Sequence, residues 1–200
     1  MRKKLLKKYY SLVERLLEPM VRCDVSPDAV SWLSVIISFA AGILYAYGNF
    51  FYGGIVLLLS GFLDTLDGTI ARLKGQSTRF GALLDSTLDR YADFSVFAGL
   101  LIFYKHHWVF FIIILSIIGS FMVSYVKARA ESLGTTRVVG LMQRPERLLL
   151  MAAGSLLTVP ASWHSGDFSD VPVITALCIL AILTNITALH RLFAAKKELS

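Results

Sequence analysis

The sequence predicts an all-α integral membrane protein with six transmembrane helices and an N-terminal interfacial amphipathic helix. Of its 200 residues, 56% are hydrophobic and 17% are charged, and the mean hydropathy is +0.63. A soluble globular protein carries about 25% charged residues. This composition excludes a disordered chain, a collagen-like chain and a nucleic-acid-binding tail. With only two cysteines, it also excludes a disulfide scaffold.

Residues 1–28 are predicted to form the interfacial helix and a linker. Seven basic residues lie between Met1 and Arg22, interleaved with leucine, tyrosine and valine, which is typical of a helix at the headgroup level. The segment has neither the apolar core nor the cleavage site of a signal peptide. Pro19 is expected to end or kink this helix, and Ser26 and Pro27 to cap and open the next one.

Residues 29–200 are predicted to form a six-helix bundle, so that residues 1–200 make a single membrane domain. A membrane-spanning helix needs about 20 mostly apolar residues, and the apolar runs are continuous, which favours helices over barrel strands. Tyr47-Gly48-Asn49 predicts a tight hairpin between the first two spans. The expected spans lie near residues 30–49, 51–72, 82–103, 108–128, 146–162 and 171–193.

The basic residues predict the orientation of the bundle. With six spans, 19 of the 20 basic residues fall on one side of the membrane, and only Lys105 falls on the other. Basic residues concentrate on the cytoplasmic side of membrane proteins. We therefore expect a multi-pass protein of the cell membrane with both termini in the cytoplasm. The formal net charge of +6 reflects this basic face.

Five aspartates are placed at the cytoplasmic ends of the second and third spans. Asp64 and Asp67 are three residues apart, and Asp85, Asp89 and Asp93 follow at intervals of four, so each set shares one helix face. Two carboxylates about 5 Å apart repel by about 3 kcal/mol at an effective dielectric constant near 20. A divalent cation would offset this repulsion, and an oxygen-only ligand set favours Mg²⁺, Mn²⁺ or Ca²⁺ over Zn²⁺.

Small residues and a cation accompany these acids, at Gly68, Ala71, Arg72 and Gly81. Small side chains let a ligand approach the backbone, and an arginine beside metal-binding carboxylates suits a metal-bound phosphate group. One alternative is that the acids face water or pair only with Arg72, Arg79 and Arg90, which would account for one or two of them. Another is a divalent-cation transporter, which does not explain why the acids lie only at the cytoplasmic ends.

The pattern Asp64-x2-Asp67-Gly68-x2-Ala71-Arg72-x8-Gly81-x3-Asp85-x3-Asp89 resembles the signature of the CDP-alcohol phosphotransferases. Every fixed position of the signature is filled, and the six-span layout fits the same family. Members transfer a phosphatidyl-type group from a CDP-linked lipid to an alcohol and release CMP. The resemblance therefore implies a membrane enzyme of phospholipid biosynthesis.

The resemblance also implies roles for the signature residues. It implies a two-metal site for Mg²⁺ or Mn²⁺, with Asp89 also acting as the general base, and a homodimer that binds no nucleic acid. The implied donor is CDP-diacylglycerol or its ether-lipid analogue. The implied metal ligands are Asp64, Asp67, Asp85 and Asp89. The implied CDP-lipid site is lined by Asp64, Asp67, Gly68, Ala71, Arg72 and Gly81.

One family element is only partly reproduced. Many members carry Thr-Pro-Asn-x-x-Thr at the start of the first span, where this chain has Ser26-Pro27-Asp28-Ala29-Val30-Ser31. Asp28 lacks the amide donor of asparagine and adds a negative charge, so no amide contact to the nucleotide is expected there.

A second cationic cluster bears on the acceptor alcohol. Ser-Tyr-x-Lys-Ala-Arg-Ala-Glu from Ser124, followed by Arg-x-Glu-Arg from Arg144, resembles the phosphatidylinositol phosphate and archaetidylinositol phosphate synthases. The positions that this resemblance assigns to the acceptor phosphate are Ser124, Lys127, Arg144 and Arg191. Arg147, next to Glu146, is a further candidate. The alternatives are a phosphatidylglycerophosphate synthase, another member of the family, or basic residues that only face anionic lipid headgroups.

Overall fold

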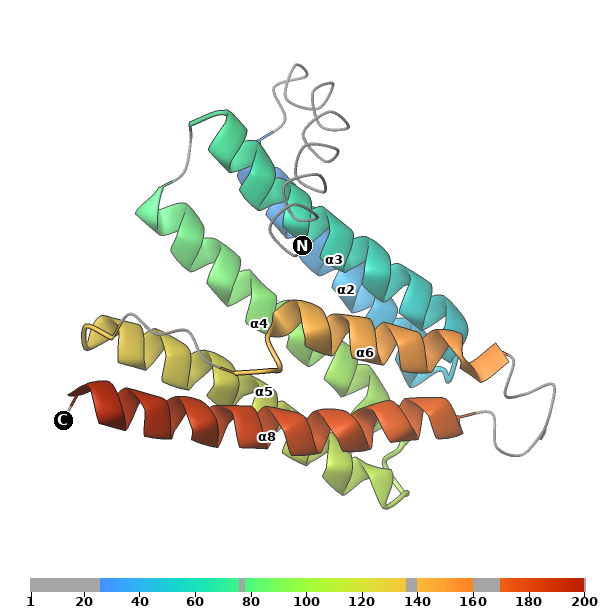
Figure 1. Ribbon diagram of the computed structural model, residues 1–200. Coiled ribbons are helices and arrows are strands. Elements are labelled where there is room, and N and C mark those ends of the chain that lie inside the picture. The colour runs from blue at the N-terminus through green and yellow to red at the C-terminus, as the bar shows by residue number, and fades with distance from the viewer. Residues whose placement is uncertain (1–25, 76–77, 136–139, 160–169, 200) are drawn as a thin grey trace, which may run out of the picture.

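The computed structural model describes residues 26–75, 78–135, 140–159 and 170–199. The helices are α2 (Pro27–Ala46), α3 (Phe50–Leu73), α4 (Arg79–Phe103), α5 (Val109–Ser132), α6 (Arg144–Leu156) and α8 (Val171–Leu199) (Figure 1). Within these ranges the chain forms helices and turns and no strand, which confirms the all-α prediction. Most of the segment predicted to carry the interfacial helix, residues 1–25, lies outside the described residues.

Four of the six described helices, namely α2, α3, α5 and α8, are long and apolar enough to cross a membrane. The prediction of six membrane-spanning helices is therefore not confirmed. Helix α4 has 25 residues, but its first 15 include Asp85, Asp89, Arg90 and Asp93. Helix α6 has 13 residues, or about 20 Å at 1.5 Å per residue, which is shorter than the hydrocarbon core of about 30 Å.

The connection between α2 and α3 is the tight hairpin that the sequence predicted. Helix α2 ends at Ala46 and α3 begins at Phe50. Gly48 between them has a φ of 75°, a left-handed conformation that glycine adopts without steric cost. Ser26 is the N-cap residue of α2 and Pro27 its first residue, also as predicted, although the Ser26 side chain makes no capping hydrogen bond.

The helices pack in two groups joined by α6. Helix α2 packs against both α3 and α4, α5 packs against α8, and α6 contacts α3 on one side and α8 on the other. Figure 1 shows α6 running across the molecule between these groups. Helices α4 and α5 also touch, so the chain of contacts closes into a bundle.

Small residues let α2 approach its two neighbours closely. A Cβ atom on Gly99 of α4 would overlap the carbonyl oxygen of Gly42, and one on Gly42 would overlap the carbonyl oxygen of Ser95. On the other side, the hydroxyls of Ser38 (α2) and Ser60 (α3) lie 2.6 Å apart. Glycine and serine at such contacts allow helix backbones to meet and hydrogen-bond inside a membrane.

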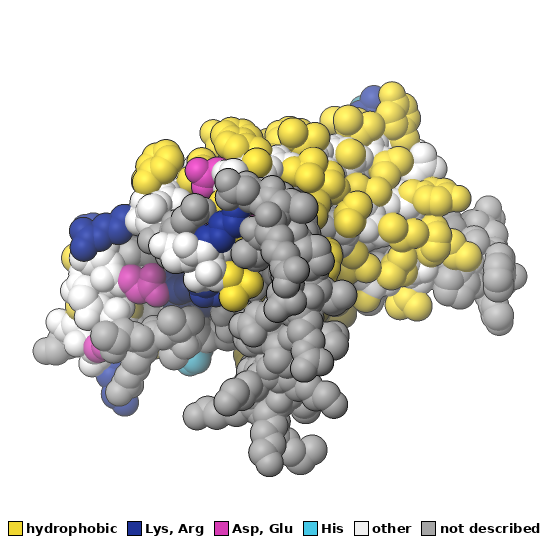
Figure 2. Space-filling model, turned by 90° about the horizontal axis from the view of Figure 1, so that it is seen from above, with side chains coloured by type: hydrophobic (Ala, Val, Ile, Leu, Met, Phe, Trp, Pro, Cys, Tyr) yellow, Lys and Arg dark blue, Asp and Glu magenta, His cyan; other side chains and the backbone are white. Residues whose placement is uncertain are grey.

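The apolar core lies toward the end of the bundle that holds the α2–α3 hairpin. It contains Tyr45, Phe50, Leu100, Tyr104 and Leu177, all buried. The outer surface carries many exposed apolar side chains. Figure 2 shows them covering much of one face, while most of the visible charged side chains gather toward one end. An apolar exterior of this extent is that of a membrane protein.

Candidate active site between α3, α4 and α6

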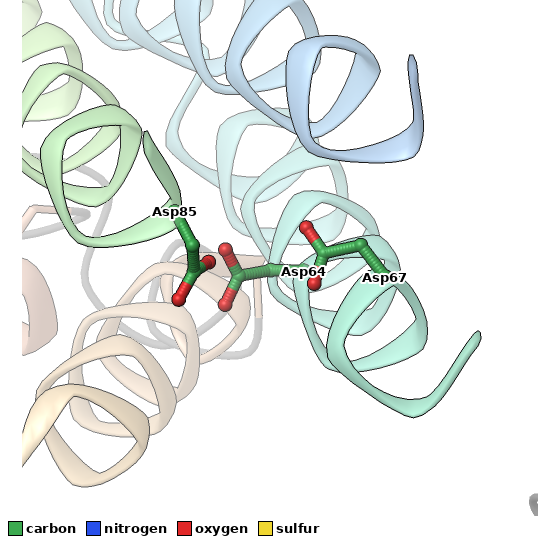
Figure 3. Close-up of side chains that lie close together, drawn as sticks. All are labelled: Asp64, Asp67 and Asp85. Atoms are coloured by element: carbon green, nitrogen blue, oxygen red, sulfur yellow. The ribbon is translucent and has the colours of Figure 1, made fainter. Parts of the chain in front are cut away.

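Three carboxylates meet where α3 and α4 face each other. Asp64 and Asp67 come from α3 and Asp85 from α4, and one oxygen from each lies within 4.8 Å of the others. Figure 3 shows the carboxylates of Asp64 and Asp85 directed toward one another. The donor set consists of oxygen atoms only, so it fits a hard divalent cation such as Mg²⁺, Mn²⁺ or Ca²⁺.

Asp67 is held in place from two sides. Its side chain is 4% exposed, and the hydroxyl of Ser31 on α2 donates to its Oδ2 at 2.5 Å. The Gly68 amide donates to its Oδ1. Hydrogen bonds of this kind fix the direction of a carboxylate that binds a cation. Ser31 was not predicted as a site residue. It is the last residue of the stretch Ser26–Ser31, which was compared above with the family element Thr-Pro-Asn-x-x-Thr.

The remaining two aspartates of α4 are bound by an arginine from the start of α6. Nη1 of Arg144 contacts Oδ2 of Asp64 and lies 2.8 Å from Oδ1 of Asp89. Nε of Arg144 lies 3.3 Å from Oδ1 of Asp93. The oxygen Oδ1 of Asp89 is buried and has no hydrogen bond, because the contact with Arg144 lacks the alignment that a hydrogen bond needs.

Asp93 connects the acid cluster to the other half of the bundle. Its Oδ2 lies 3.0 Å from Nη2 of Arg147, whose Nη1 donates to the carbonyl of Ser120 on α5 at 3.2 Å. One turn further along α5, Arg191 of α8 donates to the carbonyl of Val123 at 2.7 Å. Asp93 therefore holds two arginines at once. The signal for this role was its place in the four-residue repeat that begins at Asp85.

Arginines that are close to the aspartates in sequence neutralise little of the negative charge of the aspartate cluster. Arg90 lies 3.3 Å from Oδ2 of Asp89, whereas Arg72 donates to Thr69 at 3.0 Å. The principal partner of the cluster is Arg144, which is 51 to 80 residues away in sequence from the aspartates it contacts. The alternative in which the acids are neutralised by neighbouring arginines is therefore insufficient.

A pocket of about 360 Å³ opens beside the acid cluster. Of the six residues predicted for the CDP-lipid site, five line it, and the exception is Asp64. The Thr78 hydroxyl at its rim accepts a hydrogen bond of 2.9 Å from the Gly81 amide and so caps α4. The predicted residues in its lining are Asp67, Gly68, Ala71, Arg72 and Gly81.

A second pocket, of about 470 Å³, lies on the other side of the cluster between α3 and α6. Its polar lining includes Asp64, Asp89 and Arg144, and its apolar lining includes Phe62 and Leu148. The carboxylates thus stand between two pockets. A larger pocket of about 710 Å³ between α4 and α5 is lined by none of the predicted site residues.

The four predicted acceptor residues fall into two places. Ser124 and Lys127 lie on α5, and Arg191 contacts the same stretch of α5 through Val123. Lys127 pairs with Glu131 at 3.8 Å. Arg144 is directed instead toward the aspartates.

Comparison with known proteins identifies the family. Residues 24–188 match the CDP-alcohol phosphatidyltransferase family. The chain belongs to this family. The membership confirms the resemblance drawn from the aspartate signature.

Two relatives show how far the similarity extends. The phosphatidylinositol phosphate synthase of Mycobacteroides abscessus is 36% identical over 194 residues, covering 94% of this chain and 85% of the relative. The archaetidylinositol phosphate synthase of Pyrococcus horikoshii is 32% identical over 188 residues, which cover 94% of this chain and 92% of the relative.

Solved structures of the same family have the same fold. The phosphatidylinositol phosphate synthase of Mycobacterium tuberculosis with CDP-DAG bound superposes with a TM-score of 0.79 at 30% identity, covering 92% of this chain and 94% of the other. The same enzyme in complex with manganese and citrate superposes with a TM-score of 0.78 at 31% identity. The match covers 92% of this chain and 88% of the other.

Proposed function

We propose that this protein transfers the phosphatidyl group of CDP-diacylglycerol, or of its ether-lipid analogue, to inositol phosphate. The products are CMP and phosphatidylinositol phosphate, or the ether-lipid analogue of that lipid when the donor is the ether-lipid form. The observation that carries this proposal is the acid cluster between two pockets, one lined by five residues of the predicted CDP-lipid site and the other by Arg144. The names of the relatives and the CDP-DAG complex support it.

The carboxylates would hold two divalent cations, Mg²⁺ or Mn²⁺. Asp64, Asp67 and Asp85 would hold one of them, since their oxygens lie within 4.8 Å of each other. Asp89 would complete the second site, because its buried Oδ1 has no hydrogen bond. Bound cations would neutralise the pyrophosphate and make CMP a better leaving group. The manganese complex of a relative supports this assignment.

The CDP moiety would lie in the pocket beside Asp67. Gly68, Ala71 and Gly81 leave room there for the pyrophosphate and the nucleoside. Arg72 has a guanidinium at the same pocket, and guanidinium groups bind phosphate oxygens through paired hydrogen bonds.

Asp89 would act as the general base in the transfer. Its carboxylate takes the proton of the acceptor hydroxyl, and the hydroxyl oxygen attacks the phosphorus that carries diacylglycerol. The bond from that phosphorus to the CMP phosphate breaks, and CMP leaves with the electron pair. Oδ1 of Asp89 is paired with Arg144 but makes no hydrogen bond, so it can accept a proton once Arg144 turns away.

The acceptor's own phosphate would be held by Ser124, Lys127, Arg144 and Arg191. Arg191 is buried beside the turn of α5 that carries Ser124, and a guanidinium in such a place suits a dianionic group. Inositol phosphate is favoured over other phosphorylated alcohols by the names of the relatives.

We also propose how the protein lies in the membrane. The bundle would cross the cell membrane, with the acid cluster and both termini on the cytoplasmic side, and the short helix α6 would lie between α3 and α8 inside the bundle. The exposed apolar side chains and the position of the basic residues support this arrangement. Two copies would form a homodimer.

The proposed reaction can be tested with purified protein in detergent. CDP-diacylglycerol and Mn²⁺ or Mg²⁺ are supplied with inositol phosphate, glycerol phosphate, inositol, serine or choline, and CMP release and lipid product are measured. We expect product with inositol phosphate only. Product with glycerol phosphate alone would make the protein a phosphatidylglycerophosphate synthase, and no CMP with any acceptor would exclude the transferase.

A further inference from the structure

Arg144 occupies the oxygens that a second cation would need. A single nitrogen, Nη1, contacts Oδ2 of Asp64 and lies 2.8 Å from Oδ1 of Asp89. Mg²⁺ binds carboxylate oxygens at about 2.0–2.1 Å. A cation shared by these two oxygens would overlap Nη1. Arg144 and a cation at Asp89 therefore exclude one another.

The first cation site does not face this conflict. Asp64 has two carboxylate oxygens, and Arg144 contacts Oδ2, so Oδ1 would be available to a cation at Asp67 and Asp85. The exclusion thus applies to the cation at Asp89 and leaves the Asp64–Asp67–Asp85 cluster available.

Asp93 gives Arg144 a second point of attachment on the opposite edge of the guanidinium. Nε of Arg144 lies 3.3 Å from Oδ1 of Asp93, whose Oδ2 is held by the buried Arg147. This contact would let the Nη groups turn away from Asp64 and Asp89 while Nε stays at Asp93. Asp93 would then act as a positioning residue, which keeps Arg144 at the edge of the site.

We propose that Arg144 couples the second cation to the acceptor: it covers Asp64 and Asp89 until the acceptor phosphate draws it away. The inference rests on the proposed function, because it takes the second cation and the acceptor phosphate from there. Any ligand that favours one orientation of Arg144 shifts the affinity of the other ligand by the same factor. The second cation and the acceptor phosphate then bind cooperatively.

The experiment measures Mn²⁺ binding directly, without turnover. Mn²⁺ is titrated into purified protein in detergent, and electron paramagnetic resonance counts the bound ions and detects the spin coupling of an adjacent pair. In the wild type we expect one tight and one weak Mn²⁺, and inositol phosphate should tighten the weak one by about fivefold or more.

Substitution of Arg144 distinguishes the coupling between the second Mn²⁺ and inositol phosphate from the general effect of removing one positive charge from the protein. Arg144→Gln should tighten the second Mn²⁺ by about fivefold or more and abolish the effect of inositol phosphate. The matched control is Arg129→Gln, since Arg129 is exposed and contacts Ser132 on its own helix. Arg144→Lys keeps the charge but has no Nε for Asp93, so its second Mn²⁺ affinity should fall between those of the wild type and Arg144→Gln.

Equal Mn²⁺ affinities in Arg144→Gln, Arg144→Lys and Arg129→Gln would overturn the coupling. So would an unchanged second Mn²⁺ affinity when inositol phosphate is added to the wild type. The Arg144→Gln comparison separates this inference from the proposed function, because it needs no acceptor: a tighter second Mn²⁺ in Arg144→Gln, together with no product in the acceptor panel, would overturn the proposed function alone. Thermal unfolding in detergent shows that each variant is folded before titration.

Discussion

At the residue scale, the site depends on how a few side chains restrain the aspartates. Asp67 is buried, and its direction is set by Ser31 from another helix. Asp89 is half-buried: its Oδ2 accepts a hydrogen bond from Arg90 at 3.3 Å, and its Oδ1 lies 2.8 Å from Arg144 without a hydrogen bond. The two carboxylates therefore differ: Asp67 is fixed by hydrogen bonds from Ser31 and Gly68, whereas Oδ1 of Asp89 is held only by an ion pair, which a cation or a proton can replace.

Replacing the base tests this difference. Asp89→Asn keeps the size of the side chain but replaces the basic carboxylate by a neutral amide, which does not take the proton of a hydroxyl. We expect turnover to fall below detection while binding of the CDP-lipid, measured by equilibrium binding, remains within a few-fold of the wild type. Turnover like that of the wild type would show that Asp89 is not the base.

Ser31 is expected to affect cation affinity without touching the cation. Ser31→Ala removes the 2.5 Å hydrogen bond to Asp67, and loss of such a supporting contact lowers metal affinity by about 10- to 100-fold. Mn²⁺ titration measures the change. Ser132→Ala, at an exposed hydroxyl that bonds only within α5, is the control, and equal affinities in both variants would rule out the role of Ser31.

At the element scale, the site is placed by how closely the helices meet. Asp64 and Asp85 face each other because α3 and α4 both pack on α2. The approach of α4 to α2 relies on Gly42 and Gly99, whose backbones leave no space for a Cβ atom. The short helix α6 then brings Arg144 against both carboxylate-bearing helices.

Widening this contact should destabilise the protein. Gly99→Val places side-chain atoms against the Gly42 carbonyl, and overpacking of this kind costs about 1–3 kcal/mol. We expect a lower midpoint of thermal unfolding in detergent, together with weaker Mn²⁺ binding because α4 carries Asp85. Ala128→Val, on the exposed side of α5, should leave both quantities unchanged. The same midpoint in both variants would contradict the close packing.

At the scale of the whole molecule, charge and hydropathy are separated along the bundle. The core lies toward one end, and the carboxylates and their arginines lie toward the other. Exposed apolar side chains cover the outside. A substrate with a charged headgroup and apolar chains matches this division, since its headgroup can meet the acids while its chains stay in lipid.

The orientation of the molecule can be tested by cysteine labelling. Lys105→Cys and Lys197→Cys are made after Cys23 and Cys178 have been replaced by alanine, and intact cells are treated with a membrane-impermeant maleimide. Both lysines are exposed, so labelling reports the side of the membrane. We expect label at position 105 in intact cells, and at position 197 only after lysis. The reverse pattern would invert the topology.

The sequence alone determined the helical class, the positions of the helices and the family. Apolar runs of about 20 residues mark helices wherever the surroundings are lipid, and the predicted spans agree with the observed helices to within about six residues at each end. Five of the residues predicted for the CDP-lipid site line one pocket. Four of them, Asp67, Gly68, Ala71 and Arg72, lie within about two turns of one helix, so their proximity follows from the sequence whatever the tertiary structure.

Only the tertiary structure decided what neutralises the acids. From the sequence, Asp93 was one member of a four-residue repeat and Arg144 one member of the predicted acceptor cluster. In the structure, Asp93 forms ion pairs with both Arg144 and Arg147. Arg144 also forms an ion pair with Asp64. The structure also showed that α6, which was predicted as a full membrane span, is a helix of 13 residues. Helical periodicity specifies contacts within a helix, whereas contacts between helices far apart in sequence depend on how closely the backbones pack. Here that closeness is set by Gly42 and Gly99, which let α4 bring its aspartates to the arginines of α6.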